Sequence, residues 1–130
     1  MSIEVGLRGR ADAVVNETNT AAAAGSGSLT VFGTPFMVAL MEKAASESFL
    51  PHLPAGDSSV GTKVNIDHVS ATPLGMKVWA ESEVTLVDGK RIELTVTAYD
   101  EKGLIGKGTH ERFLITDERF LAKTARKLEG

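Results

Sequence analysis

The sequence predicts an α+β fold in which a five-stranded antiparallel sheet packs against one long helix. Two observations support this. One helical segment, from about residue 35 to 49, follows a weak strand pattern and precedes four apolar segments with the two-residue alternation of strands. Short turn sequences, among them TPLG at residues 72–75, join these four segments, and strands joined by short turns are expected to be antiparallel neighbours. One helix on one face of such a sheet is a layered α+β arrangement.

The elements before the helix are the least regular part of the pattern. Ile3, Val5 and Leu7 alternate in a weak first strand over residues 3–16, which Gly9 interrupts. Residues 19–33 are rich in alanine, glycine and serine, and they predict a mobile connection with one helical turn.

The helix has a clear beginning and end. Thr34 is a good N-cap residue, and Pro35 fits the first turn, where its missing N–H is not needed. Pro51 and Pro54 end the helix after Phe49.

The later strands are separated by turn signals. Asp88-Gly89-Lys90 is a strong hairpin signal, and a second turn, EKG, follows residue 100. The strand between these turns places Ile92, Leu94, Val96 and Ala98 on one face. A helix of about 22 Å covers part of such a sheet. The remaining surface or edge is therefore expected to pack against a second copy, in a homodimer.

Composition sets the broad class. The 130 residues suggest one domain over 1–130, with a charged tail over 116–130, and 42% hydrophobic and 24% charged residues are typical of a soluble globular protein. A net charge of −3 gives no reason to expect a nucleic-acid partner.

Several kinds of site and location are not expected. The absence of cysteine excludes disulfides and thiolate catalysis, and the spacing of the three histidines suggests no metal site. No segment resembles a signal peptide, and no apolar run approaches the ~20 residues that would span a membrane, so a cytoplasmic location is expected.

Glu42 lies where a carboxylate is unexpected. Val38, Ala45 and Phe49 are its neighbours at helical spacing, so Glu42 lies on or beside the apolar stripe. A carboxylate there must be paired or held protonated, because burying a lone charge is costly. Glu42 is therefore either a boundary residue held by an arginine or backbone donor, or a functional acid.

His68 is a second polar residue on an apparently inward face. Strand alternation puts Val60, Thr62, Val64, Ile66 and His68 on one side, and three of these are apolar and β-branched. A hydrogen-bonded core histidine is the simpler interpretation. Glu42, His68 and a hydroxyl residue such as Thr34 could also form an acid–base and nucleophile set.

Two further features point to a site. Gly61 lies inside a strand, which often marks the close approach of a ligand or another backbone. Gly106, Gly108, His110 and Arg112 share one face of the last strand and suggest a groove. Arg112 is either a surface charge or the partner of Glu42.

Three motifs, FGTPFMVALMEKA, GTKVNIDHVSATPLG and GKGTHERFLI, resemble the fluoroacetyl-CoA thioesterase-like branch of the hotdog-fold thioesterases. The resemblance runs from about Val5 to Leu121. It implies a catalytic set of Thr34, Glu42 and His68, a substrate-binding Gly61 near the thioester carbonyl, and Arg112 in the acyl pocket. It also implies a hotdog dimer with sites between subunits, no cofactor, and coenzyme A thioesters as substrates.

One departure from this family concerns the acyl group. Its fluoroacetyl-specific enzyme carries phenylalanines in the lid segment before the helix, where this chain has Gly25 and Ser28. The resemblance thus predicts hydrolysis of a short acyl-CoA without predicting selectivity for a fluorinated acyl group. The packing of Phe32, Phe36 and Met37 would set the size of the pocket, with Phe36 touching substrate. Two alternatives remain open, a non-catalytic acyl-CoA-binding dimer and a hydratase or dehydratase of the same fold.

Overall fold

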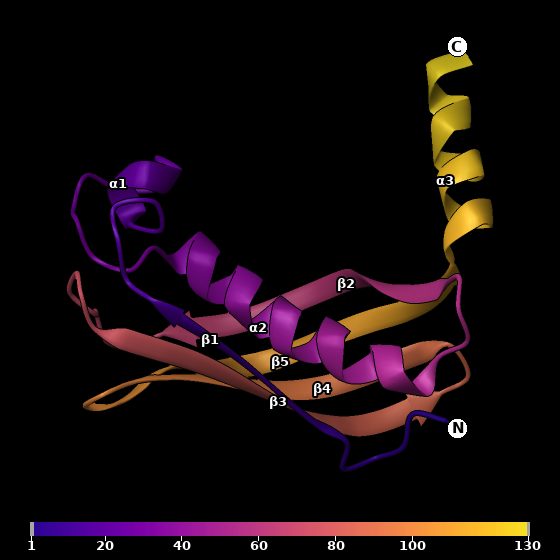
Figure 1. The fold of residues 1–130 in the computed structure, drawn as a ribbon, viewed down its shortest axis with the longest axis horizontal. Coiled ribbons are helices and arrows are strands. Elements are labelled where there is room, and N and C mark those ends of the chain that lie inside the picture. The colour runs from indigo at the N-terminus through magenta and orange to yellow at the C-terminus, as the bar shows by residue number, and fades with distance from the viewer. Residues whose placement is uncertain (1, 130) are drawn as a thin grey trace.

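A computed structural model describes residues 2–129 as a curled sheet that wraps around one long helix (Figure 1). The helical elements are α1 (Ala21–Ala24), α2 (Thr34–Phe49), η1 (Leu50–His52), α3 (Asp117–Ala125) and η2 (Arg126–Glu129). The strands are β1 (Arg8–Val14), β2 (Asp57–His68), β3 (Lys77–Asp88), β4 (Arg91–Asp100) and β5 (Gly103–Thr116).

The strand order is β1-β3-β4-β5-β2, and every neighbouring pair is antiparallel. This confirms the predicted α+β class and the five-stranded antiparallel sheet. The predicted hairpin is also present, with Asp88 opposite Arg91 and Gly89 at a φ of 61°. The expected antiparallel pairing of β2 with β3 is wrong. These strands are consecutive in the chain, but β2 pairs with β5 at the edge of the sheet.

The core lies between α2 and the concave face of the sheet, here called the inner face. Met37, Met41 and Phe49 are the largest helix side chains that it buries completely. The four alternating positions predicted on β4 all face it and are buried. Helix α2 makes closer contact with β1 and β3 than with β2, so the inner face of β2 is incompletely covered.

The first strand is shorter than predicted. It begins at Arg8, while Ile3 packs into the core separately and Val5 is 64% exposed in a turn. Gly9 lies within β1 and does not interrupt it. A side chain at Gly9 would collide with the carbonyl of Ala44, so this glycine lets α2 approach the sheet.

Residues 19–33 form a lobe beside the start of α2, called the 19–33 lobe below. Its predicted helical turn is α1, which the Thr20 hydroxyl caps by accepting from the Ala23 N–H at 3.0 Å. The lobe is anchored where the Phe32 N–H donates to the Thr72 carbonyl at 2.9 Å. Thr72 is itself buried and donates from its hydroxyl to Asp100 at 2.7 Å.

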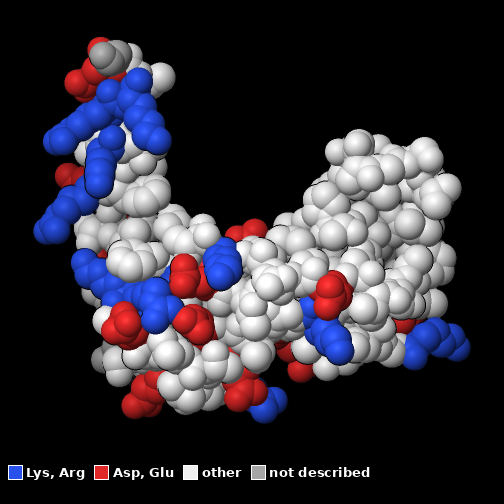
Figure 2. Space-filling view, turned by 180° about the vertical axis from the view of Figure 1, so that it is seen from behind, with Lys and Arg blue, Asp and Glu red and all other residues white. Residues whose placement is uncertain are grey.

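The C-terminal tail is helical, and α3 projects from the end of the sheet at the opposite end from the 19–33 lobe (Figure 1). Seen from behind, the free edge formed by β2 lies in a hollow between these two projections (Figure 2). The lobe side of this hollow carries no charge colour, because the chain has no charged residue between Glu17 and Glu42.

Candidate active site

Thr34 is the first residue of α2, and its hydroxyl does not cap the helix as predicted. The N-cap is Gly33, whose carbonyl accepts the first helical hydrogen bonds and which has no side chain to contribute. A side chain at Gly33 would press against the Thr20 carbonyl. The Thr34 hydroxyl is therefore available for another contact, and it lies 2.7 Å from His68 Nδ1.

His68 lies on the inner face at the end of β2, as predicted. Burial lowers the pKa of His68 below its usual value of 6.5, against a smaller opposing effect of the Ser70 backbone. The ring is therefore neutral at neutral pH, and a neutral imidazole can accept the Thr34 proton at Nδ1. Its Nε2 is buried without a hydrogen-bond partner among residues 2–129, which is unusual for a polar atom.

Thr34 and His68 open into a pocket of about 340 Å³. The 19–33 lobe and the loop after β2 form its other walls. The pocket therefore lies between the lobe and the end of β2. A hydroxyl in contact with an imidazole beside a pocket is an arrangement that can serve acid–base chemistry.

Glu42 is paired with Arg112. One guanidinium nitrogen of Arg112, Nη1, donates to Glu42 Oε2 at 3.4 Å, and the side chains are 7% and 39% exposed respectively. Of the two alternatives for Arg112, the structure thus favours the partner of Glu42 over a surface charge. The Arg112 side chain is also held by Ser59, whose hydroxyl accepts from Nε at 2.8 Å and whose carbonyl accepts from Nη2 at 3.0 Å.

Gly61 lies directly beneath Glu42. A side chain built on Gly61 would collide with Glu42 Oε2, and it would lie 3.3 Å from both Arg112 Nη1 and His110 Cε1. Gly61 therefore permits the carboxylate to reach the strand. This is the close approach that a glycine inside a strand indicated.

A β-bulge between Gly61 and Lys63 changes the predicted face of β2. Beyond the bulge, Val64, Ile66 and His68 share the inner face as predicted. Val60 and Thr62 do not, because the extra residue reverses the alternation, and the Thr62 hydroxyl donates to Glu111 at 2.7 Å. The same bulge lets Gly61 oppose Arg112 on the inner face.

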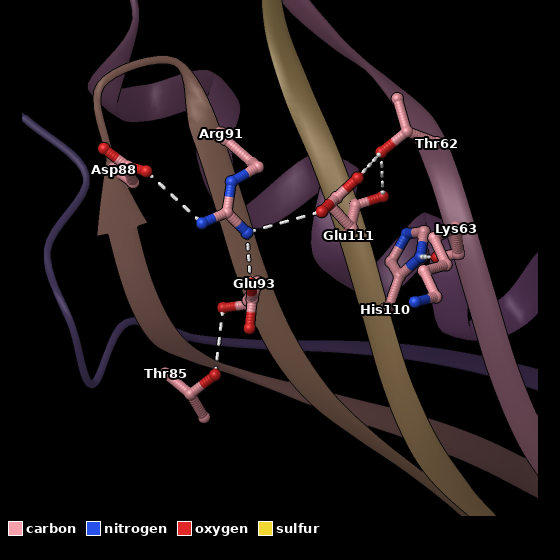
Figure 3. A network of polar contacts seen from close by, with 8 residues as sticks. All are labelled: Thr62, Lys63, Thr85, Asp88, Arg91, Glu93, His110 and Glu111. Carbon is pink, nitrogen blue, oxygen red and sulfur yellow. Dashed lines mark hydrogen bonds and ion pairs between the residues drawn. The ribbon is translucent and has the colours of Figure 1, made fainter.

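The opposite, outer face carries an ionic network (Figure 3). Arg91 forms ion pairs with Asp88, Glu93 and Glu111, and the last of these also accepts from Thr62. The Thr62 hydroxyl is the largest cause that lowers the pKa of Glu111. A groove of about 560 Å³ also lies on this face between β1 and β4, and none of the predicted site residues lines it. The single Arg91 guanidinium links carboxylates on β3, β4 and β5.

Three apolar side chains that were expected to set the pocket size lie in or against the core. Phe36 is half-buried and packs against the core around α2, whereas Phe32 and Met37 are fully part of that core. Two residues that were not predicted as site residues, His110 and Ser59, contact Arg112. Alternation had placed His110 on the face of Arg112, and this was the available signal.

Residues 2–129 contain neither a candidate membrane span nor a candidate metal site. No helix there is long and apolar enough to cross a membrane. No group of three or more His, Cys, Asp or Glu side chains in that range could hold a metal ion.

The site residues form two separate clusters within one chain. Thr34 and Glu42 are both on α2 but eight residues apart, which is about 12 Å along the axis. One cluster therefore contains Thr34 with His68, and the other contains Glu42 with Gly61 and Arg112.

Comparisons with known proteins show the family to which this chain belongs. Residues 15–118 match the family model of the fluoroacetyl-CoA-specific thioesterase, FlK. A fluoroacetyl-CoA thioesterase of Streptantibioticus cattleyicolor is 43% identical over 97 residues, which cover 75% of this chain and 70% of that protein.

Solved structures give the same result. A structure of the fluoroacetyl-CoA thioesterase FlK superposes with a TM-score of 0.91 at 37% identity, covering 98% of both chains. A thioesterase-superfamily member from Thermus thermophilus superposes with a TM-score of 0.89 at 29% identity, covering 98% of this chain and 94% of that one. The hotdog fold and the enzyme class, a thioester hydrolase, that the motifs predicted are thereby confirmed. The chain belongs to the family of the fluoroacetyl-CoA-specific thioesterase FlK.

Proposed function

We propose that this protein hydrolyses a short acyl-CoA thioester to the free acid and coenzyme A. The observation that carries the proposal is the Thr34–His68 contact of 2.7 Å. The Thr34 hydroxyl is free to make it because Gly33, and not Thr34, is the N-cap of α2. Glu42, held against Gly61 by Arg112, supplies the carboxylate. Relatives support the substrate class, since FlK has been crystallised with acetyl-CoA, and with fluoroacetate and CoA.

The active unit in this proposal is a homodimer formed through β2. Strand β2 is an edge strand of 12 residues, and Val64 on its inner face is 38% exposed. An edge of this length presents free N–H and C=O groups that a second copy can pair with. The hollow between the 19–33 lobe and α3 leaves room for that copy (Figure 2).

The register of this pairing would join the two clusters. Asn65 lies midway between the bulge at Thr62 and His68, so a two-fold axis near Asn65 brings His68 of one copy opposite the bulge of the other. Thr34 and His68 of one subunit then face Glu42 and Gly61 of its partner. Each dimer has two such composite sites.

The chemistry follows from these groups. Glu42 either attacks the thioester carbonyl to form an anhydride, which water then hydrolyses to release the acid and restore the carboxylate, or takes a proton from the attacking water. Neutral His68, hydrogen-bonded to Thr34, exchanges protons with the reacting groups, so that the C–S bond breaks and CoA leaves as a thiol. The backbone N–H near Gly61 stabilises the oxyanion, and one such donor typically contributes about 2.7–4 kcal/mol.

Thiol release from a panel of acyl-CoAs, from acetyl to decanoyl with fluoroacetyl and aryl forms, tests the proposal. The variant Glu42→Gln should lose hydrolysis of every thioester that the unmodified chain cleaves. The matched control is Glu47→Gln, which alters an exposed carboxylate on the same helix that pairs with Lys43 at 3.8 Å. Saturable acyl-CoA binding without any thiol release would overturn hydrolysis in favour of a binding dimer.

Mixing two impaired variants tests the composite site. Thr34→Val homodimers should be about 100-fold less active and Glu42→Gln homodimers inactive, while mixed dimers should regain one intact site out of two. Recovery after co-refolding would support sites shared between subunits. No recovery from a mixture whose mixed dimers are verified by mass spectrometry would contradict the register.

A further inference from the structure

His110 is a buried histidine that the proposed chemistry does not use. It lies on the inner face of β5, two residues before Arg112, and is 3% exposed. Both of its ring nitrogens have partners. Nδ1 lies 2.8 Å from the carbonyl oxygen of Lys63 (Figure 3), and Nε2 lies 3.3 Å from Arg112 Nη1.

These partners select one protonation state of the ring. A carbonyl oxygen can only accept a hydrogen bond, so Nδ1 carries the hydrogen. A guanidinium can only donate, so Nε2 is bare and accepts. His110 is therefore neutral, and its tautomer follows from its neighbours.

The surrounding charges agree with a neutral ring. Burial is the largest effect on the pKa of His110 and lowers it, and the positive charge of Arg112 lowers it further. The Lys63 carbonyl on β2, Glu42 on α2 and Glu111 on β5 oppose that shift without reversing it. A proton on Nε2 would also set two donors, and two positive charges, against each other.

The effect on the site passes through Arg112. Ser59 takes the hydrogens of Nε and one from Nη2, which leaves Nη1 to face both His110 and Glu42. The two hydrogens of Nη1 lie in the guanidinium plane in fixed directions. When His110 accepts one of them, the other is directed at Glu42 Oε2, 3.4 Å away.

We infer that His110 is a positioning residue of this site: as the neutral Nδ1–H tautomer it holds the Arg112 guanidinium in the orientation that aims it at Glu42. The inference rests on the proposed function for its effect on the rate. The tautomer and the contact with Arg112 can be tested without it. The series of contacts runs from the carbonyl of Lys63 at the β2 bulge through His110 and Arg112 to the Glu42 carboxylate.

The first test is the imidazole ¹H–¹⁵N spectrum of the full-length protein, in which the two neutral tautomers are distinguished by their nitrogen shifts. His110→Gln assigns the His110 signals by their loss. The expected result is an Nδ1–H tautomer that stays neutral at neutral pH. An Nε2–H tautomer, or an imidazolium at neutral pH, would overturn the inference even if the protein hydrolysed no thioester at all.

The second test is the rate on the best thioester of the panel. His110→Leu keeps an apolar volume but removes both hydrogen bonds, and kcat should fall about 10- to 100-fold with a smaller change in KM. His110→Gln keeps one donor and one acceptor on a single amide and should recover most of that loss. His52→Gln, at a histidine in η1 away from both clusters, is the control and should leave kcat unchanged.

The two variants separate positioning from folding. If His110→Leu fails to fold by circular dichroism, His110→Gln and the tautomer still decide the question. A His110→Leu protein with unchanged kcat, or equal losses in the Leu and Gln variants, would overturn the positioning role. Absence of thioesterase activity in the unmodified chain would instead refute the proposed function.

Discussion

Gly61→Ala should separate activity from stability more cleanly than any other single change in this protein. The new methyl group would overlap Glu42 Oε2, which must retreat by roughly 1 Å to reach ordinary van der Waals contact. The colliding atom is the end of a flexible side chain, so the fold can absorb the change. The φ of Gly61 is also not positive, so alanine is allowed at this position.

The magnitudes follow from these two facts. A displacement of roughly 1 Å in a reacting group can cost about 100-fold in rate, so kcat should fall by about that factor. Replacing glycine by alanine where the backbone permits it stabilises a protein by about 0.4–1 kcal/mol, which should offset the displaced ion pair. The melting temperature should therefore remain within a few degrees of the unmodified protein.

Thiol release under saturating substrate and thermal unfolding followed by circular dichroism are the two measurements. Gly108→Ala is the contrasting variant, because its methyl group would meet the backbone of Asn65 and Ile66, which cannot move aside. That variant should lose stability. Wild-type kcat in Gly61→Ala, or a loss of activity that tracks unfolding, would refute the reasoning.

Three further predictions concern other parts of the structure. Thr34→Val should lower kcat by about 100-fold without lowering helix stability, because the hydroxyl contacts His68 and does not cap the helix. Thr34→Ser should retain much of the activity. A melting temperature of Thr34→Val that is several degrees lower would contradict this. Thr72→Val should cost about 1–3 kcal/mol in urea unfolding, because Asp100 loses a buried donor, and an unchanged midpoint would disprove that cost. The pKa values of His68 and His110 are lowered on folding, so between those values and 6.5 the unfolded chain binds more protons than the folded one. The contribution of these histidines to the free energy of unfolding should therefore reach its full value above pH 6.5 and decrease as the pH falls below 6.5. Urea titrations at several pH values would check this.

The features that local sequence patterns determine were predictable. The length of α2, the hairpin at Asp88 and the buried face of β4 follow from residue spacing and turn chemistry alone. The edge position of β2 could not be predicted in this way, because β2 pairs with β5 and not with β3, which follows it in the chain. Strand order is a tertiary property that adjacent segments do not encode.

The contacts among the predicted site residues could be predicted only in part. The bulge after Gly61 shifts the register by one residue, and a single shift reverses the faces of Val60 and Thr62. The role of Thr34 likewise depends on whether the helix begins at it or after it, and propensities do not resolve one residue at a helix end. Arg112 could be identified as the partner of Glu42 only from its position in the fold, because the two residues are 70 positions apart in the chain.

The 19–33 lobe has a consequence for how enzymes of this kind can change. Its interior residues, 22–30, are all exposed, and it is secured mainly through Thr20 and Phe32 at its two ends. Substitutions within it remove little buried surface, so they cost little folding free energy. Yet the lobe walls the pocket of Thr34 and His68, which lie on the rigid scaffold. Mutation and selection can therefore reshape this pocket while the sheet, α2 and the stability of the fold stay largely unchanged.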